Sequence, residues 1–292
     1  RLKEAEESTR KAIEINPNFA SAYSNLGSIL KDLDRLKEAE ESTRKAIELN
    51  PDFADSYSNL GNILKDLGKI KEAELSHRKA IELKSDFADA HFNLANIELL
   101  QGNYQSGLKN YEFRFQTKKP SIPHGKVNIK KFTDKKLHTN DKLLVISEQG
   151  LGDTIQFMRY IPYLKKQGYD ISFCAQSKLH TLIKSSAIDS NPLTPDEGSL
   201  VSEGQWIPLL SLARYLQVRP NNPIVSEPYI FPSIELKEKW KNILSKEKRP
   251  IVGINWQGNP GMEKSLYQKR SLPLEMFSIL AQDNELKLLS LQ

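Results

Sequence analysis

The sequence has few of the residues that signal a disulfide scaffold, a membrane span or a metal site. Its 292 residues include a single cysteine, Cys174, so no internal disulfide can form and a reducing cytoplasm is the expected compartment. No segment approaches the roughly 18 uninterrupted apolar residues that a membrane-spanning helix needs. Histidine, cysteine and aspartate do not cluster with metal-ligand spacing, so we expect neither a bound metal nor a cofactor.

The chain also lacks a strong charge imbalance. The 42 lysines and arginines exceed the 37 aspartates and glutamates by only enough to give a net charge of +5. This excess could attract a phosphorylated ligand but is too small to indicate a nucleic-acid partner. A chain of this length exceeds the usual size of one domain, so we expect two or more hydrophobic cores.

A repeated segment dominates the first part of the chain. The segment that begins at Arg1 recurs at Arg35 and Lys69, and loosely at Asn103, with a period of 34 residues. This period is typical of tetratricopeptide helix-turn-helix repeats, so residues 1–116 are predicted to form an α-helical solenoid. Because the first segment matches the second helix of a repeat, the array begins mid-repeat and we expect further repeats or a cap upstream.

Small residues recur at helical spacing where neighbouring helices are expected to touch. Gly27, Gly61 and Ala95 occupy one such position in successive first helices. Apolar residues at helical spacing around them predict the faces that pack within each helix pair.

A polar pair recurs on each first helix, away from the packing positions. Stacked repeats would align these amides on the inner face of a superhelix, where they could hydrogen-bond an extended peptide backbone. The alternative is that duplication copied the asparagines and only solvent contacts them. The pairs are Asn25 with Ser28, Asn59 with Asn62, and Asn93 with Asn96.

With their Asn-Leu-Gly signature, the repeats resemble those of the eukaryotic O-linked N-acetylglucosamine transferases. The resemblance implies that an asparagine ladder lines the superhelix and holds acceptor polypeptides. A polypeptide or protein is therefore the expected partner of the repeats.

The pattern changes after the repeats. Residues 117–141 are interpreted as a basic linker, with a phosphate-binding role as the alternative. Residues 142–232 alternate short apolar runs with amphipathic helices, which predicts an α/β domain with a parallel, doubly wound sheet. The expected strands are 142–147 and 170–174, and the expected helices lie near 154–167 and 178–185.

A second α/β unit is expected after a connector at residues 233–249, which carries a helix near 235–244. Residues 250–292 are interpreted as the truncated start of this second domain, because so few strands cannot make a covered sheet. Its expected strands are 251–256 and 286–291, and its expected helix lies near 274–281.

The loop between the first strand and its helix is a candidate site. Gly150 and Gly152 would let the backbone approach a substrate, and the helix that begins near Thr154 would direct N–H donors at an oxyanion. Asp153 could be a general base toward an acceptor hydroxyl or a helix cap. The third glycine of a dinucleotide fingerprint would fall at Ile155, so dinucleotide binding is disfavoured.

A second polar loop follows the strand that begins at Ile251. It is a candidate diphosphate clamp, because Lys269 and Arg270 supply charge-assisted donors just before a helix. The alternative is that both are ordinary surface cations. The other candidate donor-binding residues of this loop are Trp256, Gln257, Gly258 and Asn259.

Four stretches, 148–160, 208–212, 252–260 and 270–273, together resemble bacterial repeat-linked glycosyltransferases, which are similar in turn to ADP-heptose heptosyltransferases. The resemblance implies a GT-B-like fold in which residues 250–292 begin the C-terminal nucleotide-sugar-binding domain. It also implies that Asp153 is the catalytic base and that Arg270, with Lys269 beside it, lies on the diphosphate of the donor. Ile207 departs from the histidine that many relatives carry.

The expected function is therefore metal-independent transfer of a sugar from a nucleotide-sugar to an acceptor hydroxyl. The only Asp-x-Asp triplet, Asp32-Leu33-Asp34, lies in a repeat turn, which disfavours a metal-dependent GT-A mechanism. The alternative is a non-catalytic tetratricopeptide interaction scaffold that carries a degenerate or incomplete glycosyltransferase domain.

Overall fold

The computed structural model describes residues 1–133, 138, 141–255, 271–282 and 285–291. The chain folds as two compact units, Arg1–Phe231 and Pro232–Gln292.

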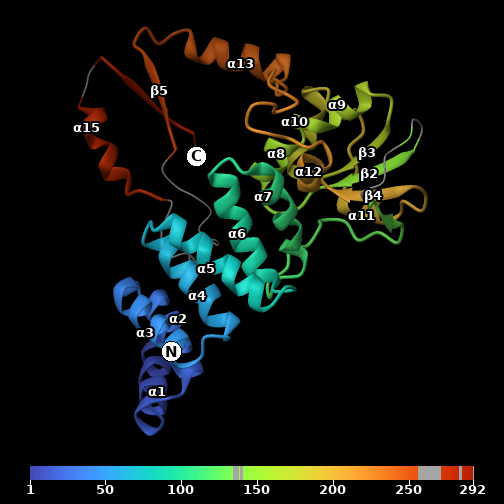
Figure 1. Cartoon of the computed structure of the whole chain (residues 1–292). Coiled ribbons are helices and arrows are strands. Elements are labelled where there is room, and N and C mark those ends of the chain that lie inside the picture. Colours follow the sequence, from blue (N-terminus) through green and yellow to red (C-terminus); the bar gives the residue numbers. More distant parts are fainter. Residues whose placement is uncertain (134–137, 139–140, 256–270, 283–284, 292) are drawn as a thin grey trace. The chain divides into compact units, whose positions relative to one another are not determined.

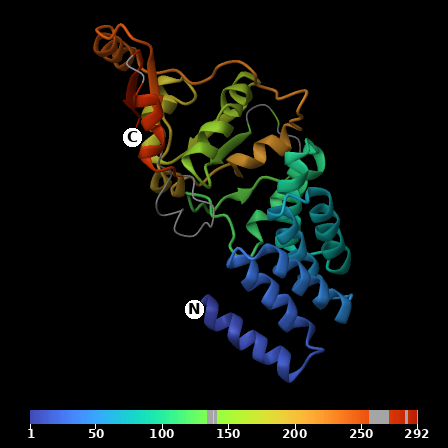
Figure 2. The same cartoon turned by 90° about the vertical axis from the view of Figure 1, so that its left-hand side faces the viewer.

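The first unit begins with a row of helices that pack in successive antiparallel pairs (Figure 1). Figure 2, turned by 90°, shows the same helices following one another along the array. The first helices of the repeats, α2, α4 and α6, are neighbours, and the second helices lie beside them. Their bounds are α1 Leu2–Ile15, α2 Ala20–Asp32, α3 Leu36–Leu49, α4 Ala54–Asp66, α5 Ile70–Leu83, α6 Ala88–Leu100 and α7 Tyr104–Tyr111.

Glycines allow the close approach of helices that the sequence predicts. A Cβ added at Gly27 would lie 2.0 Å from Thr43 Oγ1, and one added at Gly61 would lie 2.6 Å from His77 Nε2. The turns after the first helices also need a left-handed backbone, with φ of 60° at Asp34 and 77° at Gly68. The repeat therefore keeps the turn geometry even where aspartate replaces glycine.

The array leads into a four-stranded parallel sheet with the order β1-β4-β2-β3. The segment expected to be a basic linker contributes β1 and the buried Phe132. The bounds are β1 Lys130–Lys131, β2 Lys142–Ile146, β3 Asp170–Cys174 and β4 Gln205–Pro208.

The central strand β2 buries alternate side chains on opposite faces of the sheet. Leu143 and Val145 belong to the main core, which also receives Leu108 from the last repeat helix. Leu144 and Ile146 pack on the other face with Cys174. Leu108 therefore joins the last repeat helix to the core of the sheet, whereas the earlier repeats pack around separate clusters.

Short helices connect the strands. The helix expected near residues 154–167 is divided into α8 and α9, and the helix expected near 178–185 begins as a 3₁₀ turn. The bounds are η1 Glu112–Phe115, α8 Leu151–Phe157, α9 Tyr160–Lys166, η2 Ser177–Leu179, α10 His180–Ser185, α11 Pro195–Ser199, η3 Leu209–Ser211 and α12 Leu212–Tyr215.

The second unit has a parallel pair of strands, β5 and β6, as the apolar runs predict. None of the helices in the described part of the chain is both long enough and apolar enough to cross a membrane. The bounds in this unit are α13 Ile234–Leu244, β5 Ile251–Ile254, η4 Leu274–Phe277, α15 Ser278–Ala281 and β6 Lys287–Ser290.

His77 is the most unusual buried residue of the helical array. Its side chain is fully buried against Gly61, and neither ring nitrogen has a hydrogen-bond partner among the described residues. Burial, with a smaller effect from the charge of Lys65, lowers its pKa to about 4. The folded protein therefore holds this imidazole neutral.

We predict that protonation of His77 destabilises the protein in acid. The pKa is lowered on folding, so the stabilisation is complete above the unfolded value near 6.5 and is lost as the pH falls toward 4. Between pH 7 and pH 4 the free energy of unfolding should fall by about 3 kcal/mol more in the wild type than in His77→Thr. Urea denaturation across this pH range measures the difference.

Threonine is the matched replacement because Thr43 stands at the equivalent position of the preceding repeat and fits against Gly27. Any cavity left by the smaller side chain lowers stability equally at every pH. The comparison is therefore between the slopes of the free energy of unfolding against pH. Parallel pH profiles for the two proteins would contradict the prediction.

Candidate functional site

The predicted asparagine ladder lies on the three first helices, and its members differ in environment. Asn25 is exposed, whereas Asn59 and Asn93 are half-buried. Asn59 Nδ2 donates to Ser24 Oγ at 3.0 Å, which connects α4 to α2, and Asn96 Nδ2 donates to the Phe92 carbonyl of its own helix. Two of the asparagine side chains therefore already donate hydrogen bonds within the array.

Two aspartates lie beside this row. Asp55 and Asp89 occupy the second position of α4 and α6. The Lys118 backbone N–H donates to Asp89 Oδ1 at 3.3 Å, while its Nζ lies 4.0 Å from Asp55 Oδ1. Since one lysine reaches both carboxylates, the two aspartates share one face of the array.

A buried ion pair joins the end of the array to the sheet. Arg114, in η1, donates from Nε and Nη2 to the two carboxylate oxygens of Glu148 at 3.1 and 2.8 Å. Both side chains are fully buried. Glu148 Oε1 also accepts from the Leu210 backbone N–H at 3.2 Å, so one carboxylate connects the helical array, β2 and η3.

The surroundings of Arg114 keep it charged. Burial by itself lowers the pKa of Arg114, but hydrogen bonds and charge from Glu148 and Glu112 outweigh it, and the pKa lies above its ordinary value. The guanidinium also lies over the rings of Tyr111 and Phe115, at 4.8 and 4.2 Å from their centroids. The pair is therefore both hydrogen-bonded and stacked.

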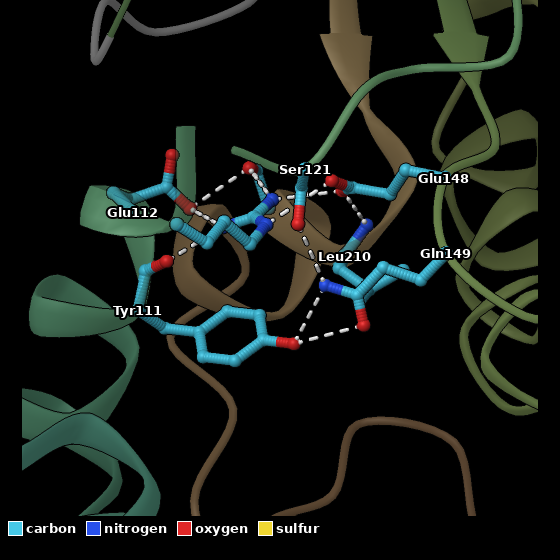
Figure 3. Close-up of polar contacts among 8 residues, drawn as sticks. Tyr111, Glu112, Ser121, Glu148, Gln149 and Leu210 are labelled. Carbon is cyan, nitrogen blue, oxygen red and sulfur yellow. Dashed lines mark hydrogen bonds and ion pairs between the residues drawn. The ribbon is translucent and has the colours of Figure 1, made fainter. Parts of the chain in front are cut away.

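Gln149, the residue after Glu148, extends the hydrogen-bond network around the ion pair. Its backbone is left-handed, with φ of 61°. Figure 3 shows the Gln149 amide and the Tyr111 hydroxyl pointing toward each other, and Gln149 Nε2 donates to Tyr111 Oη at 3.0 Å and to Ser121 Oγ at 3.3 Å. The loop that leaves β2 is thus held at Glu148 and Gln149, close to its start.

The glycine-rich part of the loop begins α8. Gly150 N–H donates to Asp153 Oδ2 at 3.0 Å, so the carboxylate of Asp153 caps the helix. A Cβ added at Gly152 would meet no described atom within 4 Å, and the space beside it is open. Thr154 is buried, and its hydroxyl donates to Gln176 Oε1 at 3.0 Å.

The other predicted donor-binding residues lie outside the described part of the chain. They are Trp256, Gln257, Gly258, Asn259, Lys269 and Arg270. The diphosphate contact expected of Arg270 and Lys269 therefore stays a prediction. Ile207 is described and is buried in the main core, which fits an apolar residue at this position.

Sequence reasoning missed Arg114 and Glu148 as a pair. A helix-end arginine and a strand-end glutamate have no shared spacing, so no motif connects them. The only signal is that Glu148 closely follows an apolar strand, where a charged residue needs a partner if it is buried.

Comparison with family models identifies the helical array. A tetratricopeptide repeat model matches residues 20–53, a second covers residues 43–74, and a TPR repeat model covers residues 61–102. The tetratricopeptide prediction is therefore confirmed for residues 20–102. The resemblance of the α/β region to glycosyltransferases is not tested by these matches and stays a prediction.

Solved structures give similar but distant matches. A crystal structure of MamA is 24% identical, with a TM-score of 0.36, over 40% of this chain and 68% of that one. A thermophilic TPR protein of Thermus thermophilus is 22% identical, with a TM-score of 0.37, over 40% of this chain and 66% of that one.

A third match is the first TPR of Spaghetti (RPAP3) bound to the HSP90 peptide SRMEEVD, at 24% identity and a TM-score of 0.33 over 34% of this chain and 79% of that one. No curated protein matches the chain. At these TM-scores the likeness assigns no function.

We predict that breaking the Arg114–Glu148 pair strongly destabilises the first unit. Arg114→Met leaves a buried carboxylate without its cation, which typically costs about 3–5 kcal/mol. Arg114→Met combined with Glu148→Leu removes both charges and should cost less than the single change. Urea denaturation of the two single variants and the double variant gives the coupling energy.

Arg44→Met is the matched control, because Arg44 pairs with Glu40 at 2.8 Å while half its side chain is exposed. An exposed pair of this kind contributes at most about 1 kcal/mol. Equal losses in Arg114→Met and Arg44→Met would contradict the structural role of the buried pair.

Proposed function

We propose that this protein is an interaction scaffold whose tetratricopeptide array holds an extended polypeptide along α2, α4 and α6. The observation that carries the proposal is the row of amides and carboxylates on these neighbouring helices. Within the described ranges, no hydrogen bond engages the side-chain amides of Asn25, Asn62 and Asn93. Such amides can donate to and accept from a peptide backbone of any sequence.

The chemistry of the row favours a neutral or basic partner. Asp55 and Asp89 attract cations, and the chain's own Lys118 places its Nζ 4.0 Å from Asp55 while its backbone N–H donates to Asp89. An acidic peptide would instead meet like charge, which costs affinity. We therefore propose a partner segment with lysine or arginine side chains that reach the two aspartates while its backbone contacts the asparagines.

Three labelled peptides of equal length, with lysine, alanine or glutamate on the same serine background, test this proposal. The wild type should bind the lysine peptide most tightly and the glutamate peptide least. Asp55→Asn combined with Asp89→Asn should remove the preference, because an amide keeps the size of the side chain but not its charge. Fluorescence anisotropy measures each affinity.

Glu14→Gln combined with Glu41→Gln is the control, since it makes the same change in net charge at exposed positions of α1 and α3. This control should keep the preference for lysine. Asn59→Ala combined with Asn93→Ala should weaken the binding of all three peptides alike, because contacts to the peptide backbone are lost. Failure of every peptide to bind, or an unchanged preference in the aspartate variant, would reject the proposal.

Glycosyl transfer is a second candidate, favoured by the position of the β2–α8 loop. The loop leaves the carboxyl end of a central parallel strand, which is where open α/β sheets bind ligands. Among the described residues, no atom lies within 4 Å of a Cβ added at Gly152, and the backbone before it is fixed by the Glu148 and Gln149 contacts. In this proposal Asp153 leaves its capping contact to accept a proton from the acceptor hydroxyl.

We predict that Asp153→Asn lowers turnover while leaving folding nearly intact, because an amide oxygen can still cap α8 but cannot accept the proton. Loss of a general base typically costs about 10²–10⁴ in rate. Arg270→Ala should weaken donor binding as well as turnover, since it removes a charge-assisted contact to the diphosphate. Release of nucleotide diphosphate from a panel of nucleotide-sugars measures the turnover of both variants, and its dependence on donor concentration reports donor binding.

Gly152→Ala provides a matched probe of the same loop. The added methyl group fits the folded chain but would obstruct a donor placed against the backbone, so KM should rise without loss of stability. Wild-type turnover in Asp153→Asn would show that Asp153 only caps the helix. Absence of turnover in the wild type would reject glycosyl transfer and leave the scaffold as the only proposed function.

A further inference from the structure

The packing of the last repeat helix on the α/β region forms a hollow that neither proposed function uses. Three adjoining lobes of about 260, 310 and 620 Å³ meet at Tyr104 and Arg219. One wall comes from the α6–α7 turn and α7, and the opposite wall comes from residues 213–223 in α12 and after it. The lobe of about 310 Å³ is also lined by residues 156–160 of α8 and α9. We call this space the junction hollow.

The wall after α12 is held in place by two local features. Helix α12 ends with Gln217 in a left-handed conformation, with φ of 53°, while Val218 N–H donates to the Ala213 carbonyl at 3.0 Å. Arg219 and Asn222 then exchange backbone hydrogen bonds at 3.1 and 3.0 Å, which closes a tight turn. This turn fixes the backbone from which the Arg219 side chain extends.

Gln217 occupies a position that usually favours glycine. A helix that ends in this way most often has glycine at the left-handed residue, because other side chains are strained there. In this chain the position holds glutamine, and this residue lines the smallest lobe of the hollow. The strain is consistent with a need for this amide at the lobe.

The smallest lobe is lined by cations. Lys109, Arg214 and Arg219 contribute to it, together with the amides of Gln105 and Gln217. No acidic side chain of the described chain lines any of the three lobes. Lys109 and Arg219 also have no ion pair within the described ranges, whereas Arg10, Arg35, Arg44 and Arg78 of the repeats are each paired with a glutamate.

Lys109 and Arg219 line the same lobe and have no ion pair within the described ranges, so their like charges repel each other unless an anion lies between them. We propose that the junction hollow binds a small phosphate-bearing ligand, with Lys109 and Arg219 on the phosphates and Arg214, which also has a contact of its own, beside them. The amides of Gln105 and Gln217 would donate to the remaining oxygens. Tyr104 and Val218, which line both the cationic lobe and the more apolar one, offer a surface for the less polar part of the ligand.

The ligand would connect the two halves of the first unit. Lys109 belongs to the repeat array, whereas Arg214 and Arg219 belong to the α/β region. A ligand that binds only the folded arrangement stabilises it by mass action, so the melting temperature should rise with ligand concentration. This inference does not depend on peptide binding or on sugar transfer.

Isothermal titration with inorganic pyrophosphate, adenosine diphosphate and uncharged adenosine tests the proposal on the full chain. A phosphate-bearing probe should bind and raise the melting temperature, whereas adenosine should not. Lys109→Ala combined with Arg219→Ala should weaken that binding about tenfold or more, because two charge-assisted contacts are lost. Added sodium chloride should weaken binding as well.

Lys37→Ala combined with Lys71→Ala is the matched control, since both lysines are exposed on second helices of the repeats. This control should bind as the wild type does. The proposal is overturned if neither phosphate-bearing probe binds, if adenosine binds as tightly as adenosine diphosphate, or if the pocket variant and the control bind alike.

Discussion

The ion pair between Arg114 and Glu148 determines how the helical array meets the sheet. Its two charges are fully buried, so neither can be hydrated. Glu148 depends on Arg114 for its cation, whereas Arg114 also pairs with Glu112 at 3.0 Å. The pair is satisfied only when η1, the end of β2 and the Leu210 backbone N–H are all in place. An apolar contact could join the same elements. It would allow the helical array to shift along the sheet, whereas a bidentate hydrogen-bonded pair holds the two in one position.

Both candidate sites beyond the repeats depend on this packing. Glu148 immediately precedes Gln149 and the glycine-rich loop, so the ion pair also sets where that loop begins. On the other side of the contact, Leu108 in the main core holds α7 against α12 and thereby forms the junction hollow. A shift of the array relative to the sheet would therefore change the loop and the hollow together.

The sequence predicts what is periodic or local and misses what is formed by contacts between distant residues. The 34-residue period reveals the helix pairs, and the apolar runs reveal β2 and β3. Strand β4 escapes prediction, because its four residues are too few to show alternation beside the apolar stretch that follows. Arg114 and Glu148 are separated by 34 positions and belong to different elements, so their pairing has no sequence signature.

Asp153 satisfies the first turn of a helix, and it is also the residue to which the glycosyl-transfer proposal assigns the role of base. Its Oδ2 accepts from the Gly150 N–H, which completes the first turn of α8. A capping carboxylate and a catalytic base can be the same residue, since the group needs only to exchange one hydrogen-bond donor for another when substrate enters. The free-energy difference between the capping and the catalytic state of Asp153 is the difference between these two hydrogen bonds. A cap contributes about 1 kcal/mol, which a substrate hydroxyl bound beside the open Gly152 could readily offset.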